Sequence, residues 1–317
     1  MKKALITGLT GQDGIALSKL LLSKGYEVHG LVRRPSQGYK SIPDHKIITH
    51  IGDLCDHHSL SSIINRIQPD EIYNLGAMSH VRHSFDIPTY ALDTVAMGTA
   101  RLLEAARPIK GIKFYQASSS EMFGNSPAPQ SETTLFNPRS PYAVAKVAAH
   151  NLANNYREAY GMFVCCGILF NHEGPNRSDD FVTRKITKAV ANILFGLQSE
   201  LVLGNLDAKR DFGLSDDYVE AMYMMMQHEK PDDYVVATGE THSVKEFLEV
   251  AFSYAGLNWQ DYVRYDSKFA RPTEVNVLCG DATKITKILG WKPKTSFVDL
   301  VKLMVDNDIA IVRPYTR

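Results

Sequence analysis

Apolar and polar positions follow two different patterns along the first half of the chain. Short apolar runs of strand length occur at 3–7, 27–32, 71–75 and 113–117. Between them, the segments 15–23, 60–67 and 96–106 carry apolar residues at helical spacing, and Gly25 is placed to end the first of these helices. Strands and helices that alternate at this spacing indicate an α/β fold with a parallel, doubly wound sheet. Such a sheet binds ligands beyond the carboxyl ends of its strands.

The pattern changes after Asn171. Residues 171–180 are polar and rich in turn-forming types, and short helical and strand-like segments follow them. We expect a Rossmann-like doubly wound domain in residues 1–170, with return segments near 206–240 that include a strand at 234–238. We expect most of 171–317 to form a smaller C-terminal α/β lobe that binds the substrate.

The composition limits which binding partners and which cellular compartment are expected. The chain has 317 residues with 35 basic and 35 acidic side chains, so its charge favours neither nucleic acid nor a membrane surface as a partner. Its four cysteines show neither a disulfide framework nor zinc spacing. No apolar run reaches the roughly 20 residues of a membrane span, and the first strand begins too early to leave room for a signal peptide. We expect a cytoplasmic protein with reduced thiols.

Three glycines, Gly8, Gly11 and Gly14, lie between the first predicted strand and the first predicted helix. Glycine permits a tight turn and lets a pyrophosphate approach the backbone N–H groups at the helix start. An ordinary strand–helix turn is the alternative, but the position after the first strand of an α/β chain predicts a dinucleotide site. Together with Thr7, the G-x-x-G-x-x-G spacing resembles the short-chain dehydrogenase/reductase superfamily.

The end of the second predicted strand distinguishes the two nicotinamide cofactors. NAD sites usually place an acid there, whereas this chain has Arg33 and Arg34. Two cations favour the 2′-phosphate of NADP through charge-assisted hydrogen bonds, so we predict NADP, with a solvated basic pair as the alternative. Asp53 and Leu54 resemble the superfamily's adenine-contacting pair, and residues 74–77 resemble its strand end beside the cofactor.

A Tyr142-x-x-x-Lys146 pair follows a predicted helix start, with Ser140 as N-cap and Pro141 as the first helical residue. The pair lies one turn apart on one helix face, so the ammonium, with the cofactor's positive ring, can lower the phenol pKa. A phenolate can take a hydroxyl proton as hydride leaves the same carbon. With 15 tyrosines, about one such spacing is expected by chance, and we weigh this one by its position in the chain.

Ser119 and Glu121 lie shortly before this helix. Ser119 is predicted to hydrogen-bond the same substrate oxygen as Tyr142, and a polar strand end is the alternative. Glu121 is the residue that separates the possible reactions, because removing water from a sugar needs a base at C5 and an acid for the departing oxygen. One carboxylate can serve both roles in turn. A solvated glutamate, or a simple hydrogen bond to the substrate, is the alternative.

Over nearly its whole length the chain resembles the GDP-mannose 4,6-dehydratases, a family of extended short-chain dehydrogenases that modify nucleotide sugars. The matching stretches are 4–14, 68–75, 116–121, 138–146, 155–163, 167–173, 181–185 and 271–274. The resemblance implies a redox-neutral cycle in which Tyr142, supported by Lys146 and Ser119, takes the C4 hydroxyl proton while NADP⁺ accepts hydride. Glu121 would then remove the C5 proton and help expel the C6 hydroxyl as water. Hydride returns to C6, and the product is a GDP-4-keto-6-deoxy sugar.

The resemblance also implies two sets of binding residues. The cofactor set is Gly8, Thr10, Gly11, Gln12, Asp13, Gly14, Arg33, Arg34, Asp53, Leu54, Leu75, Gly76, Ala77, Tyr142, Lys146 and His172. The substrate set is Ser79, Ser84, Ser119, Glu121, Asn171, Val182, Lys185, Gly204, Arg210, Arg271 and Glu274. Within the second set, the arginines at 210 and 271 are expected to face the pyrophosphate by forked hydrogen bonding, and the acid at 274 to face the nucleotide's sugar.

The chain departs from the family pattern at several places. Serine replaces threonine at Ser119, which preserves the hydroxyl, and Gly76 replaces alanine, which we expect to loosen that strand end. The segment after Arg34 is shorter than in the family, where it reaches a neighbouring subunit, and Asn176-Arg177 stands where the family has two arginines. These two changes leave a homodimer and a homotetramer both open. A shortening near 262–269 leaves a GDP-manno-heptose open beside GDP-mannose.

Other interpretations of the sequence have less support. His57-His58 and His80-x-x-His83 have no third ligand at fixed spacing, so we predict no metal. The methionines at 222–226 fall in a helical stretch and are expected in the core. An NADPH-dependent GDP-4-keto-6-deoxy-sugar reductase and a nucleotide-sugar 4-epimerase remain as alternative enzymes. A non-catalytic NADP-binding protein is disfavoured, because Ser119, Glu121, Tyr142 and Lys146 are all present.

Overall fold

A seven-stranded parallel sheet forms the centre of the larger lobe. The computed structural model describes residues 1–33, 42, 44–266, 273 and 275–313. The strand order is β11-β6-β5-β4-β1-β2-β3, and every pairing in this sheet is parallel. The strands are β1 (Lys3–Thr7), β2 (Glu27–Val32), β3 (Ile48–Ile51), β4 (Glu71–Asn74), β5 (Lys113–Ser119), β6 (Phe163–Leu169) and β11 (Asp233–Val236). The doubly wound sheet predicted from the apolar pattern is therefore confirmed.

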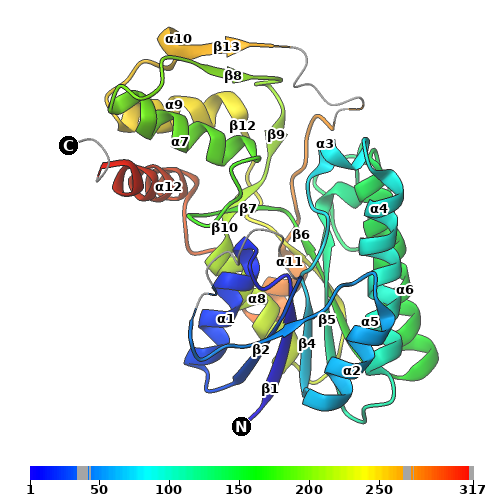
Figure 1. The fold of residues 1–317 in the computed structure, drawn as a ribbon. Coiled ribbons are helices and arrows are strands. Elements are labelled where there is room, and N and C mark those ends of the chain that lie inside the picture. The colour runs from blue at the N-terminus through cyan, green and yellow to red at the C-terminus, as the bar shows by residue number, and fades with distance from the viewer. Residues whose placement is uncertain (34–41, 43, 267–272, 274, 314–317) are drawn as a thin grey trace.

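Helices cover both faces of this sheet, so its strands are largely buried on both sides, except for the edge strand β3 (Figure 1). One face packs against α1 (Gln12–Ser23), α8 (Ser215–Gln227) and α11 (Thr283–Leu289). The other face packs against α2 (His57–Ile67), α5 (Gly98–Ala106) and α6 (Pro141–Tyr160). The short elements α3 (Val81–Ser84), α4 (Pro88–Leu92), the π-helix η1 (Asp93–Met97) and the 3₁₀-helix η2 (Ser120–Met122) lie between these strands and helices in the chain.

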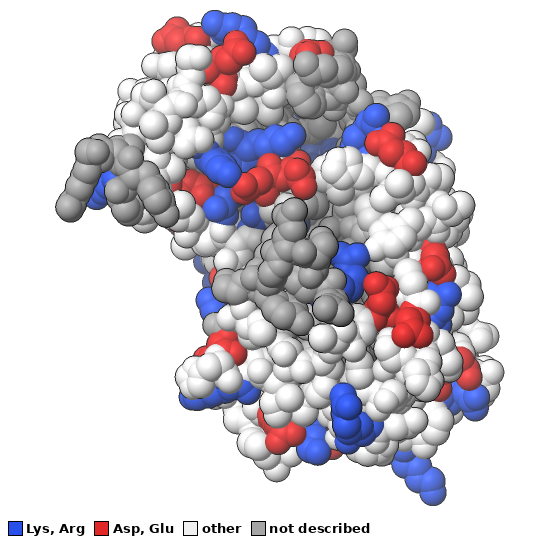
Figure 2. Space-filling view, in the orientation of Figure 1, with Lys and Arg blue, Asp and Glu red and all other residues white. Residues whose placement is uncertain are grey.

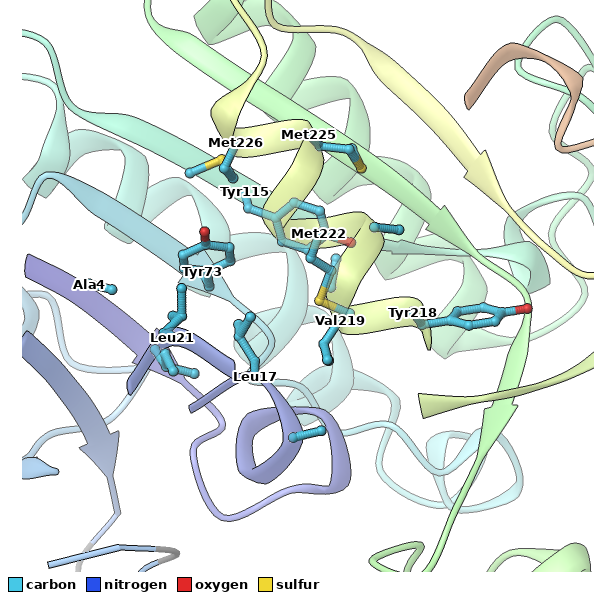
Figure 3. Packing of buried hydrophobic residues seen from close by; sticks show 14 of the residues in the cluster. Ala4, Leu17, Leu21, Tyr73, Tyr115, Tyr218, Val219, Met222, Met225 and Met226 are labelled. Carbon is cyan, nitrogen blue, oxygen red and sulfur yellow. The ribbon is translucent and has the colours of Figure 1, made fainter. Parts of the chain in front are cut away.

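The core beneath α8 is rich in sulfur and aromatic rings. Met222, Met225 and Met226 of α8 are fully buried in one cluster with Leu17 of α1 and Tyr115 of β5 (Figure 3). Methionine is unbranched and flexible, so it fills irregular space between rings and aliphatic side chains. The expectation that the methionines at 222–226 pack in the core holds for these three, while Tyr223 and Met224 are partly buried at its edge.

The second lobe has a separate core. It is built on α7 (Val182–Leu194), α9 (Val244–Tyr254) and α12 (Phe297–Val312), with α10 (Trp259–Tyr262) at its edge. Three two-stranded pairs accompany these helices: β10 with β7, β12 with β9, and β13 with β8. Their bounds are β7 (Asn171–Glu173), β8 (Leu201–Leu203), β9 (Lys209–Arg210), β10 (Phe212–Leu214), β12 (His242–Ser243) and β13 (Val263–Tyr265). The rings of Phe212, Phe247 and Phe297 meet at the centre of this core.

The chain passes between the two lobes more than once. It leaves the main sheet after β6, enters the second lobe through α7 and β8, and returns for α8 and β11. It leaves again for α9, returns for α11, and ends in the second lobe with α12 (Figure 1). Segments on both sides of each passage therefore meet at the carboxyl edge of the main sheet, where the second lobe sits.

Several element boundaries differ by a few residues from those that the pattern predicted, and two of the differences bear on the site. The predicted strand at 113–117 extends to Ser119, which brings that serine to the end of β5. The predicted helix at 96–106 is divided, because the π-helix η1 runs to Met97 and α5 begins at Gly98. Gly98 also lies against Leu54, and a Cβ at this position would be 2.9 Å from the Leu54 Cβ. Close packing against the loop after β3 therefore leaves no room for a side chain where α5 begins.

Candidate active site

A cavity of about 740 Å³ lies between the carboxyl edge of the main sheet and the second lobe. All of the predicted catalytic and cofactor residues that the structure describes line it. So do the predicted substrate residues Ser79, Asn171, Val182, Lys185, Gly204 and Arg210. In the space-filling view, Lys and Arg side chains gather along the hollow between the lobes, with acidic side chains beside them (Figure 2). The cavity thus joins backbone from one lobe to charged side chains from the other.

The glycine turn between β1 and α1 forms the floor of the cavity at its cofactor end. Gly8 adopts a positive φ of 72°, and a Cβ there would lie 2.9 Å from the Gly76 backbone nitrogen. At Gly14 a Cβ would lie 2.3 Å from the Gly8 carbonyl oxygen. Side chains are therefore excluded at these two positions of a turn that leads into the N-terminus of α1, which leaves the backbone open to a dinucleotide. The Gln12 Oε1 atom is buried here without a hydrogen-bond partner among the described residues.

The adjoining strand end is held firmly. The Gly76 amide donates to the Thr7 Oγ1 at 2.9 Å. A Cβ on Gly76 would lie 2.9 Å from the Leu54 Cδ1. Leu54 fills the space that a larger residue at 76 would occupy. The expectation that Gly76 loosens this strand end is therefore wrong.

Arg33 directly follows β2 at the far side of the cofactor end. Its Nη1 donates to the Tyr90 hydroxyl on α4 at 2.6 Å, and both residues line the cavity. Tyr90 was not predicted, because nothing in a short exposed segment after a proline marks it as a partner of Arg33. Arg34 lies outside the described residues, so its contacts stay a prediction.

The helix that carries Tyr142 and Lys146 begins as predicted. The Ser140 hydroxyl accepts a hydrogen bond from the Ala143 amide at 3.1 Å, and Pro141 occupies the first turn. Tyr142 and Lys146 are both buried, and the Lys146 Nζ lies 5.8 Å from the centre of the Tyr142 ring. The same Nζ donates to the Ala117 carbonyl oxygen on β5 at 2.6 Å. The helix N-cap and this bond together fix the pair against the strand end.

Burial has the largest effect on the pKa values of Tyr142 and Lys146. It raises the pKa of the Tyr142 phenol to about 12, although a hydrogen bond from Ser119 and the positive charge of Arg177 act to lower it. Burial also lowers the pKa of the Lys146 ammonium to about 8, against the opposing effect of the Asp13 carboxylate. In the protein without its cofactor, the phenol pKa is therefore raised, because burial disfavours the charged form. That the ammonium and the cofactor's positive ring together lower it stays a prediction.

Ser119 and Glu121 complete the chemistry end of the cavity. The Ser119 hydroxyl accepts a hydrogen bond from the Glu121 amide at 3.2 Å, which starts the short helix η2. Glu121 is buried, and its negative charge raises the pKa of Tyr142. The carboxylate is therefore close enough to the phenol for the two groups to influence each other. A hydroxyl, a phenol, a carboxyl and an ammonium meet at one strand end.

The second lobe contributes the opposite wall. Asn171 and His172 come from β7, Lys185 from α7 and Arg210 from β9, and Arg210 is buried. Ser84 is the exception among the predicted substrate residues in the described part of the chain. It is fully buried in α3, where its hydroxyl donates to the Val81 carbonyl oxygen at 2.6 Å, so it does not reach the cavity. Arg271 and Glu274 lie outside the described residues.

Arg177 lines the cavity, although the sequence analysis did not predict it as a site residue. It was considered only for subunit assembly. Its Nε lies 2.9 Å from the Glu173 carboxylate, and its guanidinium lies 3.5 Å from the centre of the Phe181 ring. Glu173 is buried and also accepts from the Thr183 hydroxyl at 2.5 Å. The four-residue spacing of an acid, an arginine and an aromatic from 173 to 181 was a signal that could have indicated this arrangement.

The fold and the site together define an enzyme of the extended short-chain dehydrogenase/reductase class. The family described as GDP-mannose 4,6 dehydratase matches residues 5–304. GDP-mannose 4,6 dehydratase 1 of Arabidopsis thaliana is 56% identical over 98% of this chain and 91% of that protein. The human GDP-mannose 4,6 dehydratase is 48% identical over 98% and 92%. The chain belongs to the GDP-mannose 4,6-dehydratase family.

Solved structures with a similar fold place this family among related enzymes. The UDP-glucose 4-epimerase of Thermus thermophilus, solved with NAD, has a TM-score of 0.87 at 25% identity and covers 96% of this chain and 98% of its own. RMD from Pseudomonas aeruginosa, solved with NADPH, has a TM-score of 0.83 at 25% identity and covers 98% and 100%.

The described residues contain no group of three or more His, Cys, Asp or Glu side chains arranged to hold a metal ion. No helix in the same residues is both long enough and apolar enough to span a membrane.

Proposed function

We propose that this protein is an NADP-dependent GDP-mannose 4,6-dehydratase, a hydro-lyase. One observation carries the proposal: Ser119, Glu121, Tyr142 and Lys146 line a single cavity with the glycine turn, in a chain that belongs to the dehydratase family. A GDP-4-keto-6-deoxy-sugar reductase or a 4-epimerase needs the same turn and the Tyr–Lys pair. A buried carboxylate beside the phenol is the feature that water elimination requires in addition.

The residues present fit a bound NADP. The turn has no room for a side chain at Gly8 or Gly14, and Asp53, Leu54 and Ala77 line the same end of the cavity. Arg33 at the end of β2 would hold the 2′-phosphate, with the Tyr90 hydroxyl fixing its guanidinium. When bound, NADP supplies the acceptor that removes hydride from C4 of the sugar and the donor that returns it to C6.

The side chains of this protein would handle the protons. Tyr142 takes the proton of the C4 hydroxyl, and Ser119 holds that oxygen in place. The ketone at C4 acidifies the C5 hydrogen, which Glu121 removes as a base. The same carboxyl then protonates the C6 hydroxyl, which leaves as water. The proton that Tyr142 took from the C4 hydroxyl balances the one returned to C5, so both residues end as they began. One water is lost for each sugar, and no net oxidation occurs.

We assign the GDP portion of the substrate to the second lobe. Lys185 and Arg210 present cations from α7 and β9, and these fit the two negative charges of a diphosphate. The arginine at 271 and the acid at 274 are proposed to join them. In this division of labour, residues 1–170 with return segments near 206–240 bind NADP, and most of 171–317 binds the nucleotide sugar.

A homo-oligomer is the assembly that we favour. Ile87, Leu92, Met97 and Val144 are exposed apolar side chains on α4, η1 and α6 or directly beside them, and α6 contacts both α4 and η1. Exposed apolar groups on neighbouring elements are typical of a protein interface. Light scattering after gel filtration decides between a dimer and a tetramer. We also place the enzyme in the cytoplasm, with which its free cysteines agree.

Mass spectrometry of GDP-mannose incubated with the purified protein and catalytic NADP⁺ tests the function. The expected result is the loss of one water, about 18 mass units, with no accumulation of NADPH. The same assay with a GDP-manno-heptose tests the alternative sugar. If neither sugar loses water, but a GDP-4-keto-6-deoxy sugar is reduced with NADPH, the protein is the reductase instead.

A further inference from the structure

His172 is held between two groups that can only accept hydrogen bonds. Its Nδ1 lies 2.7 Å from the Phe170 carbonyl oxygen, and its Nε2 lies 2.8 Å from the Asp13 Oδ2. A neutral imidazole carries one N–H, which would leave its bare nitrogen facing an oxygen lone pair. Both contacts are satisfied only when the ring is protonated on both nitrogens. The geometry therefore makes His172 an imidazolium paired with the Asp13 carboxylate.

The pair is fixed from both lobes. Asp13 lies in the first turn of α1, between Gly11 and Gly14, and His172 lies in β7. The Gln12 Nε2 donates to the Asp13 Oδ1 at 3.1 Å and to the His172 carbonyl oxygen at 3.0 Å. The Tyr218 ring of α8 stacks on the His172 ring, with centres 4.8 Å apart and an angle of 24° between their planes. Neither charged group can move away from the other without breaking these contacts.

The surrounding charges identify what the pair affects. Burial lowers the pKa of His172, but the charge and hydrogen bond of Asp13 outweigh burial and raise it, while the Arg177 guanidinium opposes them. Burial raises the pKa of Asp13, but His172 outweighs burial and lowers it, with help from Gln12 and Arg177. The Asp13 charge also raises the pKa values of Tyr142 and Lys146 on α6. The Asp13 charge also acts to raise the pKa values of the buried Tyr115 of β5 and of Asp216 of α8.

We propose that His172 is a positioning residue whose positive charge compensates the Asp13 carboxylate, so that this carboxylate does not oppose ionisation of the catalytic Tyr142. Asp13 is needed at the turn, where it and Gln12 join the cofactor end to β7. Its negative charge is unfavourable for a phenolate in the same cavity. The imidazolium removes that conflict while retaining the contact. This proposal deepens the dehydratase function proposed above and rests on it for the role of Tyr142.

Substitutions at the two members of the pair are expected to shift the ionisation of Tyr142 in opposite directions. Asp13→Asn removes the opposing charge, so the Tyr142 phenol should ionise at lower pH than in the wild type. His172→Gln leaves the carboxylate uncompensated, so the phenol should ionise at higher pH. The double variant should lie close to the wild type. A purely structural role would instead impair both single variants without moving the titration in opposite directions.

Nuclear magnetic resonance on labelled protein tests the proposal without the dehydratase assay. In the cofactor-free protein, His172 should hold its proton to a pH above that of an ordinary histidine, and Asp13→Asn should lower that pH. In the NADP⁺ complex without substrate, isotope-labelled tyrosine reports the Tyr142 phenol, with Tyr142→Phe to assign its signal. Glu27→Gln is the matched control, because Glu27 lies 2.8 Å from the His29 Nε2 in a carboxylate–imidazole pair outside the cavity.

The pH profile of kcat/KM for dehydration is the functional readout. Its acid limb, where the phenol must ionise, should move to lower pH in Asp13→Asn and to higher pH in His172→Gln. On that limb, a displacement of one pH unit changes kcat/KM by about tenfold. Displacements in the same direction, or a His172 that titrates like a free histidine, would overturn the proposal. If no dehydration occurs but both resonance titrations move as expected, the charge pair stands and the proposed function fails.

Discussion

The two walls of the cavity are built by different means. The wall from the Rossmann lobe presents backbone, and Gly14 is so close to the Gly8 carbonyl oxygen that a Cβ would lie 2.3 Å from it. The wall from the second lobe presents long charged side chains, such as Arg177, Lys185 and Arg210. This contrast indicates that a cofactor common to many enzymes is bound largely by main-chain geometry. A particular substrate is instead selected by side chains on variable segments.

The largest effect is expected from a change at the chemistry end of the backbone wall. Glu121→Gln retains the shape of the side chain but removes its proton chemistry, so water elimination should fall by about 10²- to 10⁴-fold. NADP binding, measured by calorimetry, should not change. Ser119→Thr is the matched control and should retain most activity, because the hydroxyl remains. Turnover of Glu121→Gln close to that of the wild type would remove its acid–base role.

A methyl group in the turn tests whether backbone fit binds the cofactor. Gly14→Ala should weaken NADP by about 100-fold, which corresponds to roughly 2.7 kcal/mol, because the new Cβ meets backbone that cannot move aside. Gly11→Ala is the graded comparison, since a Cβ there would lie 3.2 Å from the same oxygen, and it should cost less. Calorimetry measures both affinities, and circular dichroism checks the fold. Equal losses for the two variants would contradict the steric explanation.

A charge removed from the other wall should affect the substrate and leave the cofactor in place. Arg210→Gln should raise KM for the GDP-sugar by about 10- to 100-fold, the range expected for a lost charge-assisted hydrogen bond. NADP affinity should stay unchanged. Lys209→Gln is the neighbouring control, because Lys209 is exposed and is not among the described residues that line the cavity. A parallel loss of NADP binding in Arg210→Gln would show that the two walls do not act separately.

The smallest expected effect concerns the choice between two cofactors that share the backbone wall. Arg33→Ala should weaken NADP by about tenfold and NAD hardly at all, because only NADP carries the 2′-phosphate. The ratio of the two dissociation constants is the quantity to measure. Arg107→Ala, which alters an exposed arginine paired with Glu104, serves as the control. Equal weakening of both cofactors would remove the argument for NADP from this strand end.

Prediction from sequence succeeded where local pattern determines structure. The strands β1 and β2 have the predicted bounds, and the glycine turn and the N-cap of α6 lie where their residues indicated. In each case the signal and the structure that it forms are only a few residues apart in the chain. The backbone wall could therefore largely be predicted from the sequence, and so could the order of the catalytic groups along it.

The failures concern contacts that only the tertiary fold creates. Ser84 looked like a polar cavity residue, but α3 turns its hydroxyl back to the Val81 carbonyl oxygen. Tyr90 meets Arg33 across 57 residues of sequence, so no local pattern joins them. The raised phenol pKa of Tyr142 follows from burial, which spacing along a helix does not report. For the same reason, the contacts of side chains on the second wall cannot be predicted from sequence pattern alone and require a three-dimensional structure.

The repeated passage of the chain between the lobes limits how such an enzyme could have evolved or can be engineered. The edge strand β11 and the helix α8 belong to the larger lobe, yet they follow α7 and β8 of the smaller one in the chain. A gene fragment ending at residue 170 would encode β6 without its neighbour β11 and leave the sulfur-rich face of the sheet uncovered. An open strand edge beside an uncovered apolar face favours aggregation. The two lobes are thus inherited as one unit, and a change of sugar has to arise within the smaller lobe rather than by exchanging it.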